Sequence, residues 1–271
     1  MNEFIQIDFF SLSAEQKDIG IARLISAGFE GFEETEDGLK AFIFRKDYDE
    51  DIVAKVAEQL ETSFRTSIIE ETNWNKLWES NFDPVIVGDF VAVRAGFHAS
   101  IGNVQHELIV TPKMSFGTGH HATTYMMMQQ MQHLDFTDKT VFDFGTGTGI
   151  LAILAEKLGA IHVTAIDDDE WSIENAAENI RHNNCSNINL QRSDTPPSPD
   201  RFDIILANIN KNVIIGNFQM LTRLLEPGGI MLLSGLLKED EDVIFRKSIE
   251  YSLHIIQTTV RDNWLCVSLS C

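Results

Sequence analysis

The stretch from residue 142 to residue 149 constrains the fold most. It reads Phe-Asp-Phe-Gly-Thr-Gly-Thr-Gly and joins an apolar, strand-like run to an apolar, helix-like run. A glycine turn between a strand and a helix is typical of α/β folds with a parallel sheet, whose ligands bind at the carboxyl ends of the strands. The spacing GxGxG differs from the GxGxxG fingerprint of dinucleotide-binding proteins, which disfavours NAD. The glycines predict a turn whose backbone passes close to a nucleoside-like ligand, where any Cβ would collide.

Two polar residues farther along the chain strengthen this prediction. Asp167 ends the next predicted strand, 22 residues after Gly145, where a carboxylate can accept hydrogen bonds from both ribose hydroxyls. Asn208 follows another apolar strand at the same edge of the expected sheet. The glycine turn alone would equally suit tight packing of a strand against a helix. Gly145, Gly147, Asp167 and Asn208 together predict binding of S-adenosylmethionine by a class I methyltransferase.

Other acids near these positions have simpler interpretations. Asp168 and Asp169 precede a helix predicted to begin near Glu170, and aspartate is a common N-cap. Asp194 lies after a short predicted strand. It could reach the adenine amino group of a bound cofactor, but an ordinary loop position explains it equally well.

The hydrophobic pattern predicts two domains and a connector between them. Residues 1–72 follow the order βαββαβ of ferredoxin-like domains, and residues 73–103 form a connector in which Trp74 and Trp78 are expected to be packing anchors. Residues 104–271 are predicted to form a doubly wound, Rossmann-like parallel sheet that ends in a hairpin between residues 253 and 269. The strands predicted for this sheet cover 107–111, 140–144, 162–166, 188–191, 202–207 and 230–234. The predicted helices cover 123–134, 150–158, 170–183 and 213–225.

The charge is strongly negative and unevenly distributed. Lys and Arg number 21 against 41 Asp and Glu, a net charge of −20, which argues against tight binding to nucleic acid and favours a basic partner. Residues 1–80 hold 18 acids and 8 bases, so 18 − 8 = 10 of these negative charges lie there. No apolar run approaches the roughly 18 residues of a membrane span, and the acidic N-terminus does not resemble a signal peptide, so we expect a cytoplasmic protein. The three cysteines show no metal-binding or disulfide spacing.

A longer segment carries a family resemblance. Residues 111–124 read TPKMSFGTGHHATT, which resembles the signature of the ribosomal protein L11 methyltransferases. In that family a proline-containing strand end leads to Phe-Gly-Thr-Gly, a variable residue, His and paired threonines. Nearly the whole chain shares the resemblance. Its other motifs are WNKLWESNFDP (74–84), DFGTGTGILAI (143–153), ID (166–167), LANI (206–209), LEPGG (225–229) and LLSGLL (232–237).

This resemblance implies a set of functional expectations. Thr124, Gly145, Asp167 and Asn208 are implied as contacts of S-adenosylmethionine, and no metal is expected. The implied substrate is ribosomal protein L11, methylated on lysine ε-amines and on its N-terminal α-amine by a monomeric enzyme. The ferredoxin-like domain is implied to recognise L11, and the loop 116–119 could cover the cofactor.

The expected catalytic residue is Asn208, whose side-chain oxygen can orient an incoming amine. A base is not required, because burial beside a cationic sulfonium favours the neutral amine. His120 or His121 could accept the proton, although a structural role is more typical of a histidine in such a loop. Two alternatives are a methyltransferase for another protein's lysine or glutamine, or for a small amine, and a cofactor-binding ribosome assembly factor without catalysis.

Overall fold

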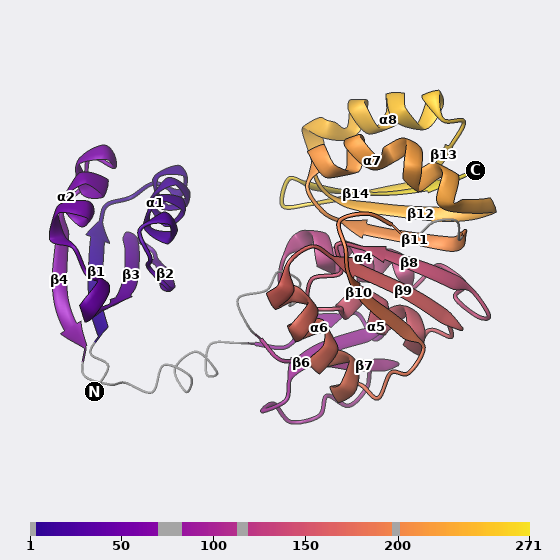
Figure 1. Cartoon of the computed structure of the whole chain (residues 1–271), viewed down its shortest axis with the longest axis horizontal. Coiled ribbons are helices and arrows are strands. Elements are labelled where there is room, and N and C mark those ends of the chain that lie inside the picture. Colours follow the sequence, from indigo (N-terminus) through magenta and orange to yellow (C-terminus); the bar gives the residue numbers. More distant parts are fainter. Residues whose placement is uncertain (1–3, 70–82, 113–118, 197–200) are drawn as a thin grey trace. The chain divides into compact units, whose positions relative to one another are not determined.

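The computed structural model of this chain describes residues 4–69, 83–112, 119–196 and 201–271. The chain forms two compact units, residues 1–81 and 82–271, each with its own sheet and helices (Figure 1). Trp74, Trp78 and most of the loop 116–119 lie outside the described residues. Among the described helices, none is long and apolar enough to cross a membrane.

The first unit has the predicted ferredoxin-like order. Its four strands form one antiparallel sheet in the order β2-β3-β1-β4, and helices α1 and α2 complete the βαββαβ pattern. The elements are β1 (Phe4–Phe10), α1 (Ala14–Ser26), β2 (Gly31–Thr35), β3 (Gly38–Phe44), a 3-10 turn (Arg45–Asp47), α2 (Glu50–Gln59) and β4 (Phe64–Ile69).

Local signals explain where both helices of this unit begin. Ser13 and Gln16 form the predicted capping box at the start of α1, each side chain bonded to the other residue's backbone amide. Asp49 caps α2 by accepting a hydrogen bond from the amide of Asp51. Apolar side chains of both helices and of the sheet then form the core of the unit. Its fully buried members include Ile7, Leu24, Leu39, Ile43 and Val53.

The second unit is built on a seven-stranded sheet in the order β10-β9-β8-β11-β12-β14-β13. The first five of these strands are parallel, and β14 lies antiparallel between β12 and β13. The predicted parallel sheet and closing hairpin are therefore confirmed. The strands are β8 (Thr140–Phe144), β9 (His162–Asp167), β10 (Ile188–Arg192), β11 (Phe202–Asn208), β12 (Leu225–Leu237), β13 (His254–Arg261) and β14 (Trp264–Ser270).

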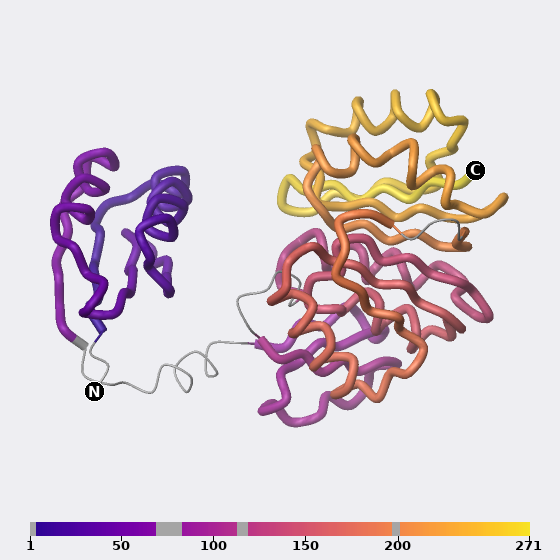
Figure 2. Tube along the Cα trace, viewed as in Figure 1, coloured from indigo at the N-terminus to yellow at the C-terminus, as the bar shows by residue number. Residues whose placement is uncertain are grey.

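Helices cover both faces of this sheet. One core joins α4, α5 and one face of the sheet, and a second core joins α7, α8 and the opposite face. Figure 2 follows the trace through these layers to the yellow strands at the C-terminus. The sequence patterns did not predict α8. The helices are α4 (Ala122–Met131), α5 (Ile150–Lys157), α6 (Glu170–His182), α7 (Lys211–Leu224), a 3-10 turn (Lys238–Asp240) and α8 (Glu241–Glu250).

One predicted strand lies in a different sheet. The strand predicted at 107–111 is β7 (His106–Val110), and it pairs with β6 (Val91–Ala95) rather than with the main sheet. The third member is β5 (Val85–Val87), so two strands within the predicted connector belong to this small sheet. Its apolar side chains complete the core beneath α4 and α5, which explains why β7 reads as a buried strand of the main sheet.

Asparagines on α6 attach β7 and the segment after it to the main domain. Asn183 both donates to and accepts from the backbone of Ile109. One turn earlier, Asn179 accepts from the amide of Thr111 at 2.7 Å and donates to the carbonyl of Thr148 at 2.8 Å. These amides replace the backbone partners that a neighbouring strand would supply. They join the chain that leads to α4 with the start of α5.

Candidate cofactor site

The predicted site residues lie at the carboxyl edge of three adjacent parallel strands. Asp167 ends β9 and Asn208 ends β11, with β8 between them. The glycine turn follows β8 directly and leads into α5. Thr124 lies in the first turn of α4, which packs on the same side of the sheet as α5. This edge is the usual ligand site of doubly wound folds.

The glycine turn has a backbone conformation that is unfavourable for residues with a side chain. Gly145, Gly147 and Gly149 have φ values of 73°, 54° and 80°, all in the left-handed region. A Cβ on Gly145 would lie 2.2 Å from Cγ2 of Ile209. The amides of Gly145 and Thr146 both donate to the carbonyl of Ile166 at 2.9 Å. The turn is thereby held close to β9 and leaves no room for a side chain at its start.

Asp167 is hydrogen-bonded to the turn and can still accept hydrogen bonds from a ligand. Its Oδ2 accepts a hydrogen bond of 2.8 Å from the amide of Gly147, and its Oδ1 accepts one of 3.1 Å from the amide of Asp169. Burial raises the pKa of this carboxyl, and the two backbone amides oppose the shift. Because a carboxylate has about four acceptor positions, each oxygen can accept one more hydrogen bond. Two hydroxyl donors of a ribose match that capacity.

Asn208 and Thr124 meet although 84 residues separate them. The Asn208 Nδ2 donates to Thr124 Oγ1 at 3.1 Å, and Thr124 is fully buried. Among the described residues, Asn208 Oδ1 is one of four buried side-chain polar atoms without a hydrogen-bond partner. Such an orphaned acceptor in a native site is commonly explained by an absent ligand or water. The side-chain amide of Asn208 is thus held in place by its nitrogen, and its oxygen can accept a hydrogen bond from a ligand.

Asp143 is a second orphaned acceptor, which the sequence analysis did not identify. It is fully buried in β8, and its Oδ2 accepts a hydrogen bond of 2.6 Å from Thr146 Oγ1. Its Oδ1 has no partner among the described residues. Burial raises the pKa of Asp143 to about 7, with the charge of Asp167 adding to the shift and hydrogen bonds from Thr146 and the Ala152 amide opposing it.

The two candidate bases have structural contacts. His121 is the N-cap of α4, with its Nδ1 2.7 Å from Thr123 Oγ1, and its ring packs edge-on against Trp264. The Nε2 of His120 lies 2.8 Å from the carbonyl of Asp83. Burial lowers the pKa of His121, which favours the neutral ring that a cap requires. These contacts support the structural interpretation of both histidines.

Of the two acids beside Asp167, Asp169 has the predicted N-cap role and Asp168 does not. Asp169 caps α6 by accepting a hydrogen bond of 2.8 Å from the amide of Ser172. Asp168 is exposed, and its carbonyl accepts a hydrogen bond from Arg192. Asp194 is exposed after β10. No cluster of three or more His, Cys, Asp or Glu that could hold a metal occurs in the described ranges.

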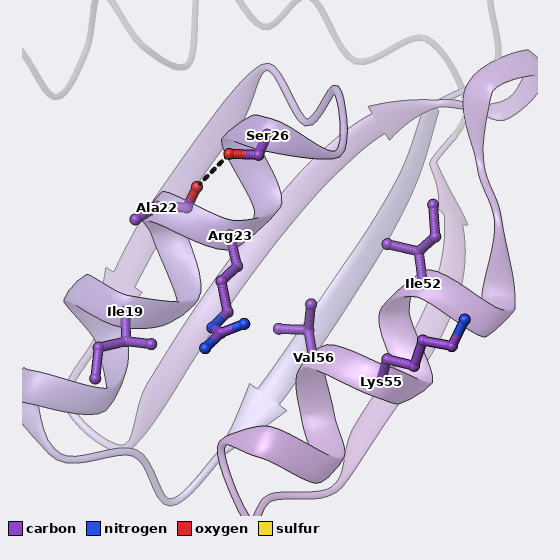
Figure 3. A pocket seen from close by; sticks show the side chains of 7 residues that line it. All are labelled: Ile19, Ala22, Arg23, Ser26, Ile52, Lys55 and Val56. Atoms are coloured by element: carbon purple, nitrogen blue, oxygen red, sulfur yellow. Dashed lines mark hydrogen bonds between the residues drawn. The ribbon is translucent and has the colours of Figure 1, made fainter.

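A separate groove lies in the first unit, between α1 and α2 (Figure 3). It has a volume of about 590 Å³ and an open mouth. Its lining is mainly aliphatic with two cationic side chains, and it contains no acid that could bind a ribose or an amine. The lining residues are Ile19, Ala22, Arg23, Ser26, Ile52, Lys55 and Val56. The carboxyl edge of the second unit is therefore the better candidate for chemistry.

The arrangement at that edge fits S-adenosylmethionine. The glycine turn provides a close backbone approach, Asp167 provides acceptors for a ribose, and two orphaned buried oxygens face no donor in the described structure. Hydroxyl and ammonium groups of such a ligand are hydrogen-bond donors, which a site with unpaired acceptors can bind. The residues present are chemically suited to hold it.

Comparison with known proteins identifies the family of this chain. Residues 7–270 match the family model of ribosomal protein L11 methyltransferase (PrmA). A ribosomal protein L11 methyltransferase of Porphyromonas gingivalis is 40% identical, with 91% of this chain and 88% of that protein covered. One of Bacteroides fragilis is 33% identical, with 92% of each covered. The crystal structure of a ribosomal protein L11 methylase from Lactobacillus delbrueckii has a TM-score of 0.65 at 28% identity, over 70% of this chain and 98% of that one. The chain therefore belongs to the ribosomal protein L11 methyltransferase family.

Proposed function

We propose that this enzyme transfers methyl groups from S-adenosylmethionine to ribosomal protein L11, with lysine ε-amines and the N-terminal α-amine as acceptors. The observation that carries the proposal is the orphaned Oδ1 of Asn208, held beside the glycine turn in a chain of this family. A fixed, unpaired amide oxygen at the carboxyl edge can accept a hydrogen bond from an incoming amine.

The cofactor contacts in this proposal are Thr124, Gly145, Gly147, Asp167 and Asn208. Asp167 accepts from the ribose, and Gly145 and Gly147 let the backbone approach it. Thr124 lies at the N-terminal turn of α4, where free amides favour a carboxylate. The bound cofactor supplies an activated methyl group on a sulfonium.

Asn208 is the proposed catalytic residue, and its task is alignment. Methyl transfer is an in-line displacement, so fixing the amine lone pair against the S–CH₃ bond gives much of the acceleration. The hydrogen bond from Nδ2 to Thr124 fixes the amide plane. An amine that donates to Oδ1 is therefore presented in one orientation. A lysine amine must lose its proton first, and burial beside positive charge lowers its pKa.

We further propose that residues 1–72 recognise L11, that residues 73–103 connect them to the catalytic residues 104–271, and that the protein acts as a cytoplasmic monomer. The acidic excess of the first 80 residues supports a basic protein partner and disfavours direct nucleic acid binding. Within this connector, β5 and β6 pack in the core of the second unit, so only the residues before Val85 would let one catalytic domain reach several acceptor amines.

Methylation of purified L11 with isotopically labelled cofactor tests the proposal. Mass spectrometry of the product should find label on lysine ε-amines and on the N-terminus. Label on another protein of a ribosome-free extract, with none on L11, would identify a different substrate. Cofactor binding without any labelled product would favour the assembly-factor alternative.

A further inference from the structure

Two glycines lie against the residue that follows Asn208. A Cβ added to Gly235, in β12, would collide with the carbonyl oxygen of Ile209 and would lie 2.7 Å from its carbonyl carbon. A Cβ added to Gly145 would collide with Cγ2 of the same isoleucine. The backbones of the glycine turn and of β12 are therefore both in direct contact with Ile209. Because β11 lies between β8 and β12 in the sheet, one contact comes from each neighbouring strand.

Gly235 bends β12 away from its regular pairing. Its φ is 82°, in the left-handed region that favours glycine, and the register of β12 against β14 shifts at this point. The pairing of β11 with β12 ends one residue earlier, where Asn208 lies opposite Ser234. A bulge of this kind bends a strand. The backbone of β12 thereby passes so close to the Ile209 peptide that no side chain fits between them.

The contacts of Ile209 hold the end of β11 from the face opposite to Thr124. Leu206 packs in the core beneath α4 and α5. Side chains alternate along a strand, so Asn208 points to that same face, where its Nδ2 donates to Thr124. Ile209 packs partly against the opposite core. Because Asn208 and Ile209 share a peptide bond, a shift of Ile209 would move the Asn208 amide with it.

We propose that Ile209 and Gly235 are positioning residues, which set the distance between the Asn208 oxygen and the glycine turn that binds the cofactor. This inference rests on the proposed function, since it concerns the acceptor side of the same site. In-line methyl transfer tolerates little misalignment, and a displacement of about 1 Å can cost about 100-fold in rate. Asp167 ends β9, which is separated from β11 by β8. Changes in the contacts of Ile209 should therefore lower kcat more than they weaken cofactor binding.

Three substitutions at position 209 test the contact with the glycine turn. Ile209→Val keeps the branch at Cβ, and with it the methyl group that contacts Gly145, so it should retain most of the activity. Ile209→Leu has no branch at Cβ, and Ile209→Ala has no γ carbon. Both should lower kcat about 10- to 100-fold, with the cofactor Kd changed less than about threefold. Single-turnover methylation of L11 at saturating cofactor and calorimetry give the two values.

The leucine and alanine variants also give the results that would contradict the proposal. Full activity of Ile209→Leu would mean that apolar bulk suffices at this position. Full activity of Ile209→Ala would mean that no contact is needed. Either result would overturn the inference, as would a rise in the cofactor Kd that matches the fall in kcat.

A pair of glycine substitutions in β12 tests the backbone contact. Gly235→Ala forces a side chain against the Ile209 peptide, and kcat should fall about 10- to 100-fold. Gly228 is the matched control, because its φ of 76° is similar but an added Cβ would meet none of the described residues within 4 Å. Gly228→Ala therefore has a similar conformational cost and should leave kcat unchanged. Equal loss of kcat in the two variants would overturn the inference, since strain in β12 would then explain it.

The side chain of Asn208 gives a readout that does not depend on turnover. In isotopically labelled full-length protein, the side-chain amide resonance of Asn208 is identified by its absence from the spectrum of Asn208→Ala. This resonance should shift in Ile209→Ala and Gly235→Ala and keep its position in Gly228→Ala. An unchanged resonance in folded Ile209→Ala would overturn the inference even if turnover falls.

Failure of the proposal is distinguishable from failure of the proposed function. If circular dichroism shows that Gly235→Ala does not fold, the series at position 209 decides alone. If the natural protein does not methylate L11, the proposed function is wrong, and the Asn208 resonance still decides whether Ile209 positions the amide.

Discussion

The Asn208 amide donates to the Thr124 hydroxyl over 3.1 Å and joins the end of β11 to the first turn of α4. Because the side-chain nitrogen of Asn208 donates to Thr124, the orientation of the amide group is fixed, and its oxygen is held in one position as a hydrogen-bond acceptor. The orientation of the Asn208 amide, the proposed catalytic group, therefore depends on a residue 84 positions earlier in the chain.

Replacing Asn208 should impair turnover more than cofactor binding. In Asn208→Ala we expect kcat to fall about 100-fold or more, as for loss of one preorganised polar group in other enzymes, with less than a tenfold rise in the cofactor Kd. Single-turnover methylation of L11 and calorimetry give the two numbers. Thr124→Ser keeps the hydroxyl and should retain most activity, whereas Thr124→Val should lose it. Full turnover by Asn208→Ala would remove Asn208 from the mechanism.

Replacing Asp167 should act mainly on cofactor affinity. Asp167→Ala removes the proposed ribose acceptor and the anchor of the Gly147 amide, so we expect the cofactor Kd to rise about 10- to 100-fold, as for a charge-assisted hydrogen bond. The exposed neighbour is a matched control, and Asp168→Ala should bind normally. Similar Kd values for the two variants would contradict the assignment.

Gly145 should not tolerate a side chain. Gly145→Ala forces a φ of 73° on alanine and a Cβ against Ile209, so we expect a loss of about 1–3 kcal/mol in the free energy of unfolding and weaker cofactor binding. The control is Gly216→Ala in α7, where the added Cβ meets open space. That variant should gain about 0.5–1 kcal/mol. Urea denaturation measures both, and equal stabilities would rule out a required glycine at position 145.

The features of the fold and of the site that have a local cause were predictable from the sequence. The glycine turn, the strand end at Asp167 and the capping box at Ser13 each depend on residues within a few positions of one another. The contact between Thr124 and Asn208 depends on the order of the strands in the sheet. The family resemblance therefore identified both residues as site residues, but the hydrogen bond between them could not be predicted from the sequence.

Tertiary contacts determined the features that could not be predicted from the sequence. β7 has the apolar pattern of a buried strand, and burial beneath α4 and α5 produces that pattern equally in a separate small sheet. α8 has few buried positions, chiefly Ile244 and Ser248, which weakens its periodic signal. Asp143 was missed because nothing local marks an aspartate within a glycine motif as a fully buried acid.

The asparagines of α6 should be structural. Asn179→Ala leaves the amide of Thr111 and the carbonyl of Thr148 without their partners, so we expect a loss of about 2–4 kcal/mol in unfolding free energy. Asn217, on the surface of α7, bonds only within its own helix among the described residues. Asn217→Ala should therefore change stability by less than about 0.5 kcal/mol. Urea denaturation distinguishes the two, and a stable Asn179→Ala would show that the segment after β7 needs no such anchor.

Asp143 should make the cofactor-free protein less stable as pH rises. Its folded pKa of about 7 lies above the ordinary value of 3.8, so the folded state binds the proton more tightly and loses that advantage between these two values. Asp143→Asn does not titrate. The stability of the variant relative to the natural protein should therefore increase by about 2 kcal/mol between pH 5.5 and pH 8, since one pKa unit corresponds to 1.36 kcal/mol.

Asp203 is a control of opposite sign for this measurement. Partial burial works against its ionisation, but hydrogen bonds from Thr140 and the charge of Lys139 outweigh burial and lower its pKa. Asp203→Asn should therefore be less stable than the natural protein at pH 8. Urea denaturation at pH 5.5 and pH 8 gives all the differences. A pH-independent difference between Asp143→Asn and the natural protein would mean that Asp143 is already ionised in the folded state, and the burial argument for its proton would then be wrong.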